Sequence, residues 1–227
     1  MDQKTDNSLY ASLRKYFDND VFSDATIRCG EQEFKVHALI LSAQSEFFAK
    51  SFSGPWKESQ GGKQINLEDV DVSVVEAMLY FMYHFEYSNV YGASTMVFNA
   101  QVYSIADRYI VPALKKYAKE KFSSAIRCGW SMDDFPLAIA EAYSSTPEED
   151  RGLRDLVVET CNKNLNQLSK NQAFREALQA TVGFAADLVL FKTDSVDRWG
   201  CPSCGHVMYE KFSTKSTGRC TNCGYCR

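Results

Sequence analysis

The sequence predicts an α+β fold in which a small sheet with helical cover is followed by a helical extension and a small cysteine-rich module. Three observations predict it. Short segments of alternating apolar and polar residues surround Gly30, apolar residues at helical spacing dominate from Val72 onward, and five of the eight cysteines lie in the last 27 residues. With 227 residues, the chain can hold one good-sized core, or one domain with a small appendage.

The sheet is predicted from two regions of the first third of the chain. A short amphipathic helix comes before it, with apolar side chains at three- and four-residue steps: Leu9, Leu13, Tyr16 and Phe17. Residues 25–29 and 33–36 then alternate in polarity on either side of Gly30, which predicts a hairpin. A further short strand is expected at residues 64–67, after a polar loop.

Helices are expected to cover this sheet. Residues 37–52 are apolar at helical spacing, and Ser42 and Ser45 indicate a break with a new N-cap. Thr146 before Pro147 is typical of an N-cap followed by proline at the first helical position. The further helices are expected at residues 75–83, 97–109, 112–122, 135–143 and 150–191.

The charge of the chain is distributed unevenly. The formal net charge is −4, yet residues 192–227 carry six Lys and Arg against three Asp and Glu. Residues 1–191 therefore carry 19 basic and 26 acidic side chains. This balance disfavours a broad nucleic-acid surface there, because phosphate binding needs concentrated positive charge. Nucleic acid stays open as a partner of the basic tail alone.

No membrane or targeting segment is expected. No apolar run approaches the roughly 18 to 20 residues that span a bilayer, and the polar residues 1–8 are unlike a secretory signal. We therefore expect an intracellular protein of the nucleus, the cytoplasm or both, with no membrane partner. In a reducing compartment, clustered cysteines favour a metal over disulfides.

Four cysteines of the tail form the pattern C-x2-C-x15-C-x2-C: Cys201, Cys204, Cys220 and Cys223. Two residues between cysteines let one tight turn aim both thiolates at a single ion, and the glycine after each pair accepts the positive φ that closes the turn. Four thiolates saturate a tetrahedral site, so we expect structural Zn²⁺ and no metal catalysis. The tail resembles a zinc ribbon, with residues 208–212 as a strand of its hairpin.

Other interpretations of the tail remain open. Cys226 can replace Cys223, His206 can replace one cysteine, and four cysteines can also hold an iron–sulfur cluster. Redox dithiols are disfavoured because they usually open a helix in a βαβ setting. Aromatic residues lie among the tail's cations, as in proteins that stack on bases and contact phosphates. We favour the simpler interpretation, in which the aromatic residues pack a small core and the cations are solvated; these cations are Lys211, Lys215 and Arg219.

The first half of the chain resembles a BTB/POZ domain. Residues 22–27, 34–42 and 45–48 resemble its opening, residues 65–70 its middle and residues 106–114 its end, all in the same order. The resemblance implies a protein–protein interaction fold, usually homodimeric, that ubiquitin-ligase adaptors and transcriptional regulators use. It suggests a fungal-type BTB protein with three parts: a BTB/POZ domain (1–126), a helical extension of the 3-box or BACK type (127–191), and a linker with the zinc-ribbon-like module (192–227).

The resemblance implies two interaction surfaces. BTB dimers bury the N-terminal helix against the partner, which suits the face of Leu9, Leu13 and Phe17; the same stripe can instead pack on its own subunit. Cullin-binding BTB domains often carry a hydrophobic-x-Glu triplet in the loop after the third helix, where this chain has Trp56 and Glu58. An aromatic anchor beside a carboxylate can fill a partner's pocket, although a Trp folded over its own domain explains the triplet equally.

These features predict an adaptor and not an enzyme. The chain has only three histidines, so few side chains are suited to acid–base catalysis. His37 is expected to be packed and hydrogen-bonded. BTB repressors commonly have a basic residue after this histidine, which pairs with an Asp like Asp24. This chain has Ala38 there, and the difference disfavours corepressor binding. We expect a homodimer that recruits an unknown client to a cullin-RING ubiquitin ligase. The alternative is a nuclear regulator whose zinc ribbon contacts nucleic acid or transcription machinery.

Overall fold

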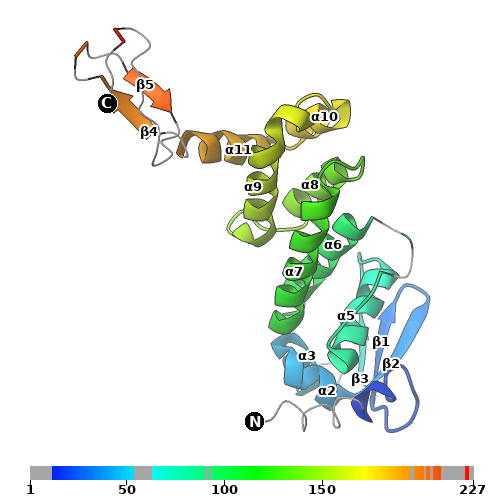
Figure 1. The fold of residues 1–227 in the computed structure, drawn as a ribbon. Helices are drawn as coiled ribbons and strands as arrows, with labels where there is room; N and C mark the ends of the chain where they lie inside the picture. Colours follow the sequence, from blue (N-terminus) through cyan, green and yellow to red (C-terminus); the bar gives the residue numbers. More distant parts are fainter. Residues whose placement is uncertain are drawn as a thin grey trace, which may run out of the picture. The chain divides into compact units, whose positions relative to one another are not determined.

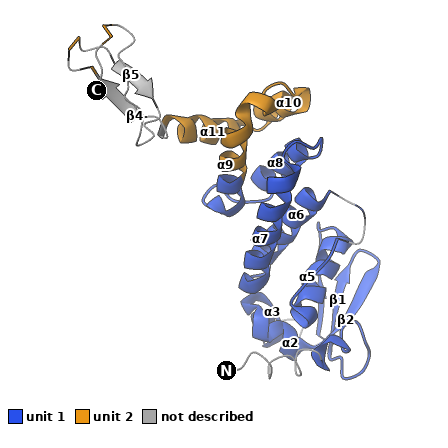
Figure 2. Cartoon of the chain, viewed as in Figure 1, with its two compact units in different colours: residues 1–156 blue, residues 157–227 orange. Residues whose placement is uncertain are grey.

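The computed structural model of the chain describes residues 12–53, 63–89, 92, 94–194, 197–201, 203–204, 207–210 and 223–224. The chain divides into two compact units, residues 1–156 and 157–227 (Figure 2). The sequence predicts domain boundaries after residues 126 and 191. They differ from the boundary between these compact units, and they remain predictions. Among the described helices, none combines the length and the apolarity that crossing a membrane requires.

The first unit contains a three-stranded sheet of order β2-β1-β3 (Figure 1). β1 (Ala25–Cys29) and β2 (Gln32–Val36) form the predicted antiparallel hairpin, and Gly30 has φ +56° in its turn. β3 (Lys63–Asn66) begins one residue earlier than predicted and pairs in parallel with β1. Alternate side chains of β1 are buried, as its pattern of polarity requires.

Two short helices follow the hairpin, α2 (Ala38–Gln44) and α3 (Glu46–Ser53). The chain breaks between them at Ser45, one of the two serines that indicate a break in the sequence. The hydroxyl of Ser45 accepts a hydrogen bond from the amide of Phe48 (3.1 Å) and donates one to the carbonyl of Tyr109 (2.6 Å). The predicted N-cap at Ser45 is therefore confirmed, and it also ties the two helices to a distant part of the unit.

Four longer helices follow: α5 (Val72–His84), α6 (Thr95–Arg108), α7 (Pro112–Gly129) and α8 (Phe135–Ser144) (Figure 1). Pro112 stands in the first turn of α7, where its missing N–H costs nothing. The central helix α5 is buried along most of its length, with Met78, Leu79 and Met82 fully buried. The prediction of helices in this region is thus confirmed.

The prediction for Thr146 is wrong. Its hydroxyl donates a hydrogen bond to the carbonyl of Ala142 at the end of α8 (2.6 Å) and accepts one from the guanidinium of Arg154 (3.2 Å). Helix α9 (Arg151–Leu168) begins later, and Asp150 accepts the amide hydrogen of Gly152 (2.8 Å) at its start. The local pattern around Pro147 failed because a buried arginine from the next helix occupies the hydroxyl.

Helix α9 begins in the first unit and ends in the second. The stretch predicted as one helical region continues as α10 (Gln172–Ala180) and α11 (Val182–Asp194). Asn171 breaks it, because its side chain accepts the amide hydrogen of Phe174 and caps α10 (3.2 Å). An antiparallel pair follows, formed by β4 (Asp197–Gly200) and β5 (Val207–Glu210). β5 confirms part of the strand predicted at residues 208–212.

Candidate functional site

Exposed apolar side chains gather where the chain enters β1 and where α2 begins. Phe22 is 80% exposed, Leu39 is 81% exposed and Val21 is 49% exposed. Phe22 also has φ +61°, a conformation that is costly for a bulky residue and is held only by its surroundings. We call Val21, Phe22 and Leu39 the apolar patch. Contiguous apolar surface of this kind is typical of interaction sites.

A hollow of about 410 Å³ adjoins the apolar patch, and its walls include Leu13, Tyr16 and Ile40. Two residues of the predicted dimer stripe, Leu13 and Phe17, make different contacts. Leu13 is half-buried and lines the hollow. Phe17 packs edge-on against Tyr80 of its own α5, with ring centroids 5.4 Å apart. Phe17 thus contacts its own subunit. The dimer contact predicted for this stripe stays a prediction, and Leu9 lies outside the described residues.

His37 is held in place by its two ring nitrogens. Nδ1 is 3.0 Å from the hydroxyl of Tyr83, and Nε2 is 3.0 Å from the carbonyl oxygen of Val21. The side chain is half-buried. A hydrogen-bonded, packed histidine is what the sequence predicts here, and this geometry orients the segment that carries the apolar patch.

Asp24 has a cationic partner that the sequence analysis missed. One carboxylate oxygen accepts the amide hydrogen of Ala38 (2.7 Å), and the other pairs with the ammonium of Lys63 (2.7 Å). Burial alone would raise the pKa of Asp24, but the bonds from Lys63 and Ala38 outweigh it and hold the pKa below its usual value. The cation comes from β3 and not from the residue after His37, because the parallel pairing brings Lys63 opposite Ala25.

Three of the four predicted metal ligands come together. The sulfur atoms of Cys201, Cys204 and Cys223 all lie within 4.8 Å of one another. Cys201 directly follows β4 and is buried, whereas Cys204 and Cys223 are exposed. Gly224 has φ +75°, the left-handed conformation predicted for the glycine after a cysteine pair.

The geometry of this cysteine cluster fits a metal ion. A tetrahedral zinc ion with Zn–S bonds of about 2.3 Å separates its sulfur ligands by about 3.8 Å. The sulfurs of Cys201 and Cys223 are 3.6 Å apart, close to that value and well beyond a disulfide bond of about 2.05 Å. Thiolates are soft donors that select zinc or iron. When bound, such an ion supplies a cross-link between segments of the tail.

The remaining predicted site residues lie outside the described residues. The fourth cysteine, Cys220, is one of them, as are its proposed substitutes Cys226 and His206. The cullin-docking candidates Trp56 and Glu58, which follow α3 in the sequence, also lie outside the described residues. The nucleic-acid candidates also stay predictions: Lys211, Lys215 and Arg219.

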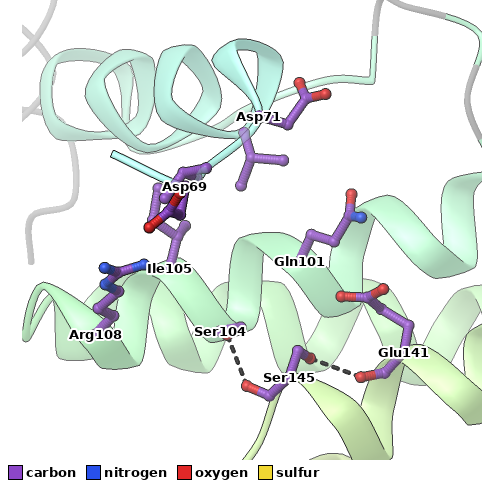
Figure 3. Close-up of a pocket in the computed structure, with 10 residues that line it drawn as sticks. Asp69, Asp71, Gln101, Ser104, Ile105, Arg108, Glu141 and Ser145 are labelled. Carbon is purple, nitrogen blue, oxygen red and sulfur yellow. Dashed lines mark hydrogen bonds between the residues drawn. The ribbon is translucent and has the colours of Figure 1, made fainter. Parts of the chain in front are cut away.

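A second hollow of about 220 Å³ lies among the segment before α5, helix α6 and helix α8. Figure 3 shows Glu141 and Gln101 at one side of it, and Arg108 and Asp69 at the other. The end of α8 is tied to α6 here, because the hydroxyl of Ser104 donates a hydrogen bond to the carbonyl of Ser145 (2.7 Å). Sequence reasoning missed this pocket, since its lining residues come from three separate segments without a shared motif.

The comparisons with known proteins concern the first half of the chain. The BTB/POZ domain family matches residues 13–125. Kelch-like protein 41b of Danio rerio is 29% identical over 123 residues, which cover 52% of this chain and 19% of that protein. Kelch repeat and BTB domain-containing protein 4 of Homo sapiens is 28% identical over 121 residues, covering 52% and 21%. BTB and MATH domain-containing protein 42 of Caenorhabditis elegans is 30% identical over 117 residues, covering 51% and 28%.

The matched region is thus less than a third of each of these relatives. Because these three are animal proteins, the fungal-type assignment stays a prediction. Among solved structures, the BTB domain of human Gigaxonin matches with a TM-score of 0.42 and 20% identity, over 53% of this chain and 92% of that one. Residues 13–125, with their hairpin, parallel third strand and helical cover, are a BTB/POZ domain.

Proposed function

We propose that this protein is an interaction adaptor rather than an enzyme. In this proposal it self-associates through its BTB/POZ domain and recruits a client protein to a cullin-RING ubiquitin ligase. The observation that carries the proposal is the apolar patch on the BTB/POZ domain, with Phe22 and Leu39 each at least 80% exposed. Removing apolar surface from water is favourable by about 25 cal/mol per Å².

A second copy of the chain is the partner that best matches the apolar patch. A two-fold interface joins the same patch on both subunits, so an apolar surface meets an apolar surface. The charged groups beside the patch are compatible with this approach, because Asp24 and Lys63 neutralise each other. Leu13 and Tyr16 border the adjoining hollow and supply further apolar contact area.

Replacement of Leu39 by Asp tests self-association. Leu39 lies in the first turn of α2, where a carboxylate is compatible with the helix dipole, so the fold is expected to survive. We expect a wild-type dimer and a Leu39→Asp monomer in sedimentation equilibrium, with the dimer dissociation constant raised at least tenfold.

The matched control is Leu137→Asp, since Leu137 is 62% exposed on α8, away from the apolar patch. This control is expected to dimerise like the wild type. A monomeric wild type at tens of micromolar, or a Leu39→Asp variant that dimerises normally, would contradict the proposed dimer.

Cullin recruitment is supported by the sequence triplet alone. Replacing both Trp56 and Glu58 by Ala removes the aromatic anchor and the adjacent carboxylate, and we expect the double variant to lose capture of a cullin in a pull-down with the full chain. Lys57→Ala, within the same triplet, is the control and should retain capture. Capture that survives the double substitution would rule out this docking loop.

The cysteine cluster has a structural role in this proposal. One zinc ion held by Cys201, Cys204 and Cys223, with Cys220 as fourth ligand, would join the two cysteine pairs of the tail. A site with four protein ligands has no position for a reactive water, which agrees with an adaptor.

A further inference from the structure

Glu141 is a half-buried carboxylate whose described neighbours are neutral. Burial raises the pKa of Glu141, and hydrogen bonds from Gln101 and Ser145 only partly offset that effect. The cation that lines the same pocket, Arg108, lies at the opposite side from Glu141 (Figure 3). Its guanidinium stands over the ring of Tyr109, 5.7 Å from the centroid. A buried charge that only neutral groups contact is unfavourable, and a cationic ligand would relieve that cost.

The rest of the pocket suits the stem of a basic side chain. Val74 and Ile105 also line it and contribute apolar side chains to its wall. Lysine and arginine lay their aliphatic stems on such surface and extend the charged head to a polar group. A volume of about 220 Å³ is below the range of about 300–1,000 Å³ typical of pockets for drug-sized ligands. The space thus fits one side chain.

The surroundings favour an extended, basic peptide over a free ion. Residues 69–71 line both this pocket and a neighbouring hollow of about 650 Å³ at the turn between β1 and β2. A peptide anchored in the first would pass into the second, beside the carboxylates of Glu68 and Asp69. A hard metal cation needs six or more oxygen ligands, and the Glu141 side of the pocket offers one carboxylate beside an amide and a hydroxyl.

We propose that this pocket binds one lysine or arginine side chain of the client protein, with its charged head paired to Glu141 and its stem on Val74 and Ile105. The inference rests on the proposed adaptor function, because it assigns the surface that holds the client. Further basic residues in the bound segment would contact Glu68, Asp69 and Asp71. The apolar patch is a separate surface, so client binding and self-association can be measured apart.

An array of random twelve-residue peptides, probed with the full chain, tests this inference. Bound peptides are expected to be enriched in Arg or Lys at one position. Replacing that residue by citrulline or norleucine, which remove the charge, should weaken binding at least tenfold. Comparing Arg with Lys at the same position decides whether the pocket prefers a guanidinium or an ammonium group.

Glu141→Gln is the matching protein variant, because it removes the charge and keeps the size of the side chain and one of its acceptor oxygens. It should weaken binding of the selected peptides at least tenfold, and it should bind charged and neutralised peptides equally. Glu149→Gln, an exposed residue in the turn before α9, makes the same charge change outside the pocket and should bind as the wild type does. An array that selects no basic residue, or peptides that bind Glu141→Gln as tightly as the wild type, would overturn the inference.

The failure of this inference is distinguishable from the failure of the adaptor proposal. Glu141→Gln should keep the wild-type dimer mass and the wild-type capture of a cullin. If these persist while no basic peptide binds, only the client pocket is wrong. If basic peptides bind through Glu141 but the wild type neither dimerises nor captures a cullin, the pocket stands and the adaptor function is wrong.

Discussion

Asp150 shows how one residue can hold three segments of the first unit together. Its carboxylate accepts a hydrogen bond from the hydroxyl of Tyr103 on α6 (2.7 Å) and pairs with the ammonium of Lys115 on α7 (2.7 Å). It also accepts the amide hydrogen of Gly152 at the start of α9. A side chain at Gly152 would collide with the hydroxyl of Tyr103, so this close approach requires glycine.

Asp150→Asn should lower the free energy of unfolding near neutral pH by about 1–3 kcal/mol, because hydrogen bonds to a charged group are lost or weakened. Burial alone would raise the pKa of Asp150, but its bonds to Lys115, Tyr103 and Gly152 hold it below the ordinary 3.8. The charged carboxylate therefore contributes fully above about pH 4, and the contribution is lost as the pH falls through the lowered pKa. Urea unfolding at several pH values measures this.

Asp155→Asn is the control for that series. Asp155 is exposed and pairs with Arg151 one helical turn away, a kind of pair worth only about 0.3–0.5 kcal/mol. If Asp150→Asn unfolds at the same urea concentration as Asp155→Asn at neutral pH, Asp150 does not hold the segments together.

At the scale of single elements, α2 and α3 depend on contacts outside themselves. They have seven and eight residues, and helices shorter than about 12–15 residues are marginal in isolation. Ser45 between them is 3% exposed and bonds both the amide of Phe48 and the carbonyl of Tyr109. Phe47 and Phe48 pack near the ring of Tyr109 as well. The break is thus a packed junction as well as a cap.

Ser45→Ala should lower the free energy of unfolding by about 1–3 kcal/mol, because it removes the cap and leaves the buried carbonyl of Tyr109 without this donor. Thermal and urea unfolding of the full chain measure the loss. Ser42→Ala is the matched control, since Ser42 lies inside α2, where alanine is the better helix former and little change is expected. Equal stability of the two variants would count against the junction.

At the scale of the whole molecule, the BTB/POZ domain and the cysteine-rich tail differ in what can stabilise them. The BTB/POZ domain buries a large apolar core along α5, α6 and α7. The tail contains two strands of four residues each, and an isolated two-stranded hairpin is at best marginally stable. Small modules of this kind commonly fold only when a metal ion joins their segments.

We expect one zinc ion per chain in elemental analysis of the reduced protein. A chelator should raise hydrogen exchange in residues 197–227, because binding of the metal supplies the folding free energy of the tail, and should leave exchange in α5 to α8 unchanged. Cys201→Ser should lose the metal. The control is Cys128→Ser, since Cys128 is exposed on α7, outside the cysteine cluster. Iron in place of zinc would indicate a cluster, and metal retained by Cys201→Ser would remove that residue from the ligand set.

The sequence by itself determined the features that depend on residues near one another in the chain. The hairpin around Gly30, the helices from Val72 onward and the cap at Ser45 follow from local spacing and turn chemistry, and the structure confirms them. The cysteine pattern also predicted the close approach of Cys201, Cys204 and Cys223, although Cys223 is distant in the chain, because one tetrahedral metal site needs thiolates from both pairs.

Only the tertiary structure decided which side chains of different segments meet where no spacing motif links them. Packing turned Phe17 onto its own α5, brought Lys63 of β3 to Asp24, and placed Arg154 on the hydroxyl of Thr146. It also enclosed Glu141 in a pocket built from three segments. Local patterns cannot predict these contacts, because each depends on how whole elements pack, and burial and charge then act on whichever groups that packing brings together.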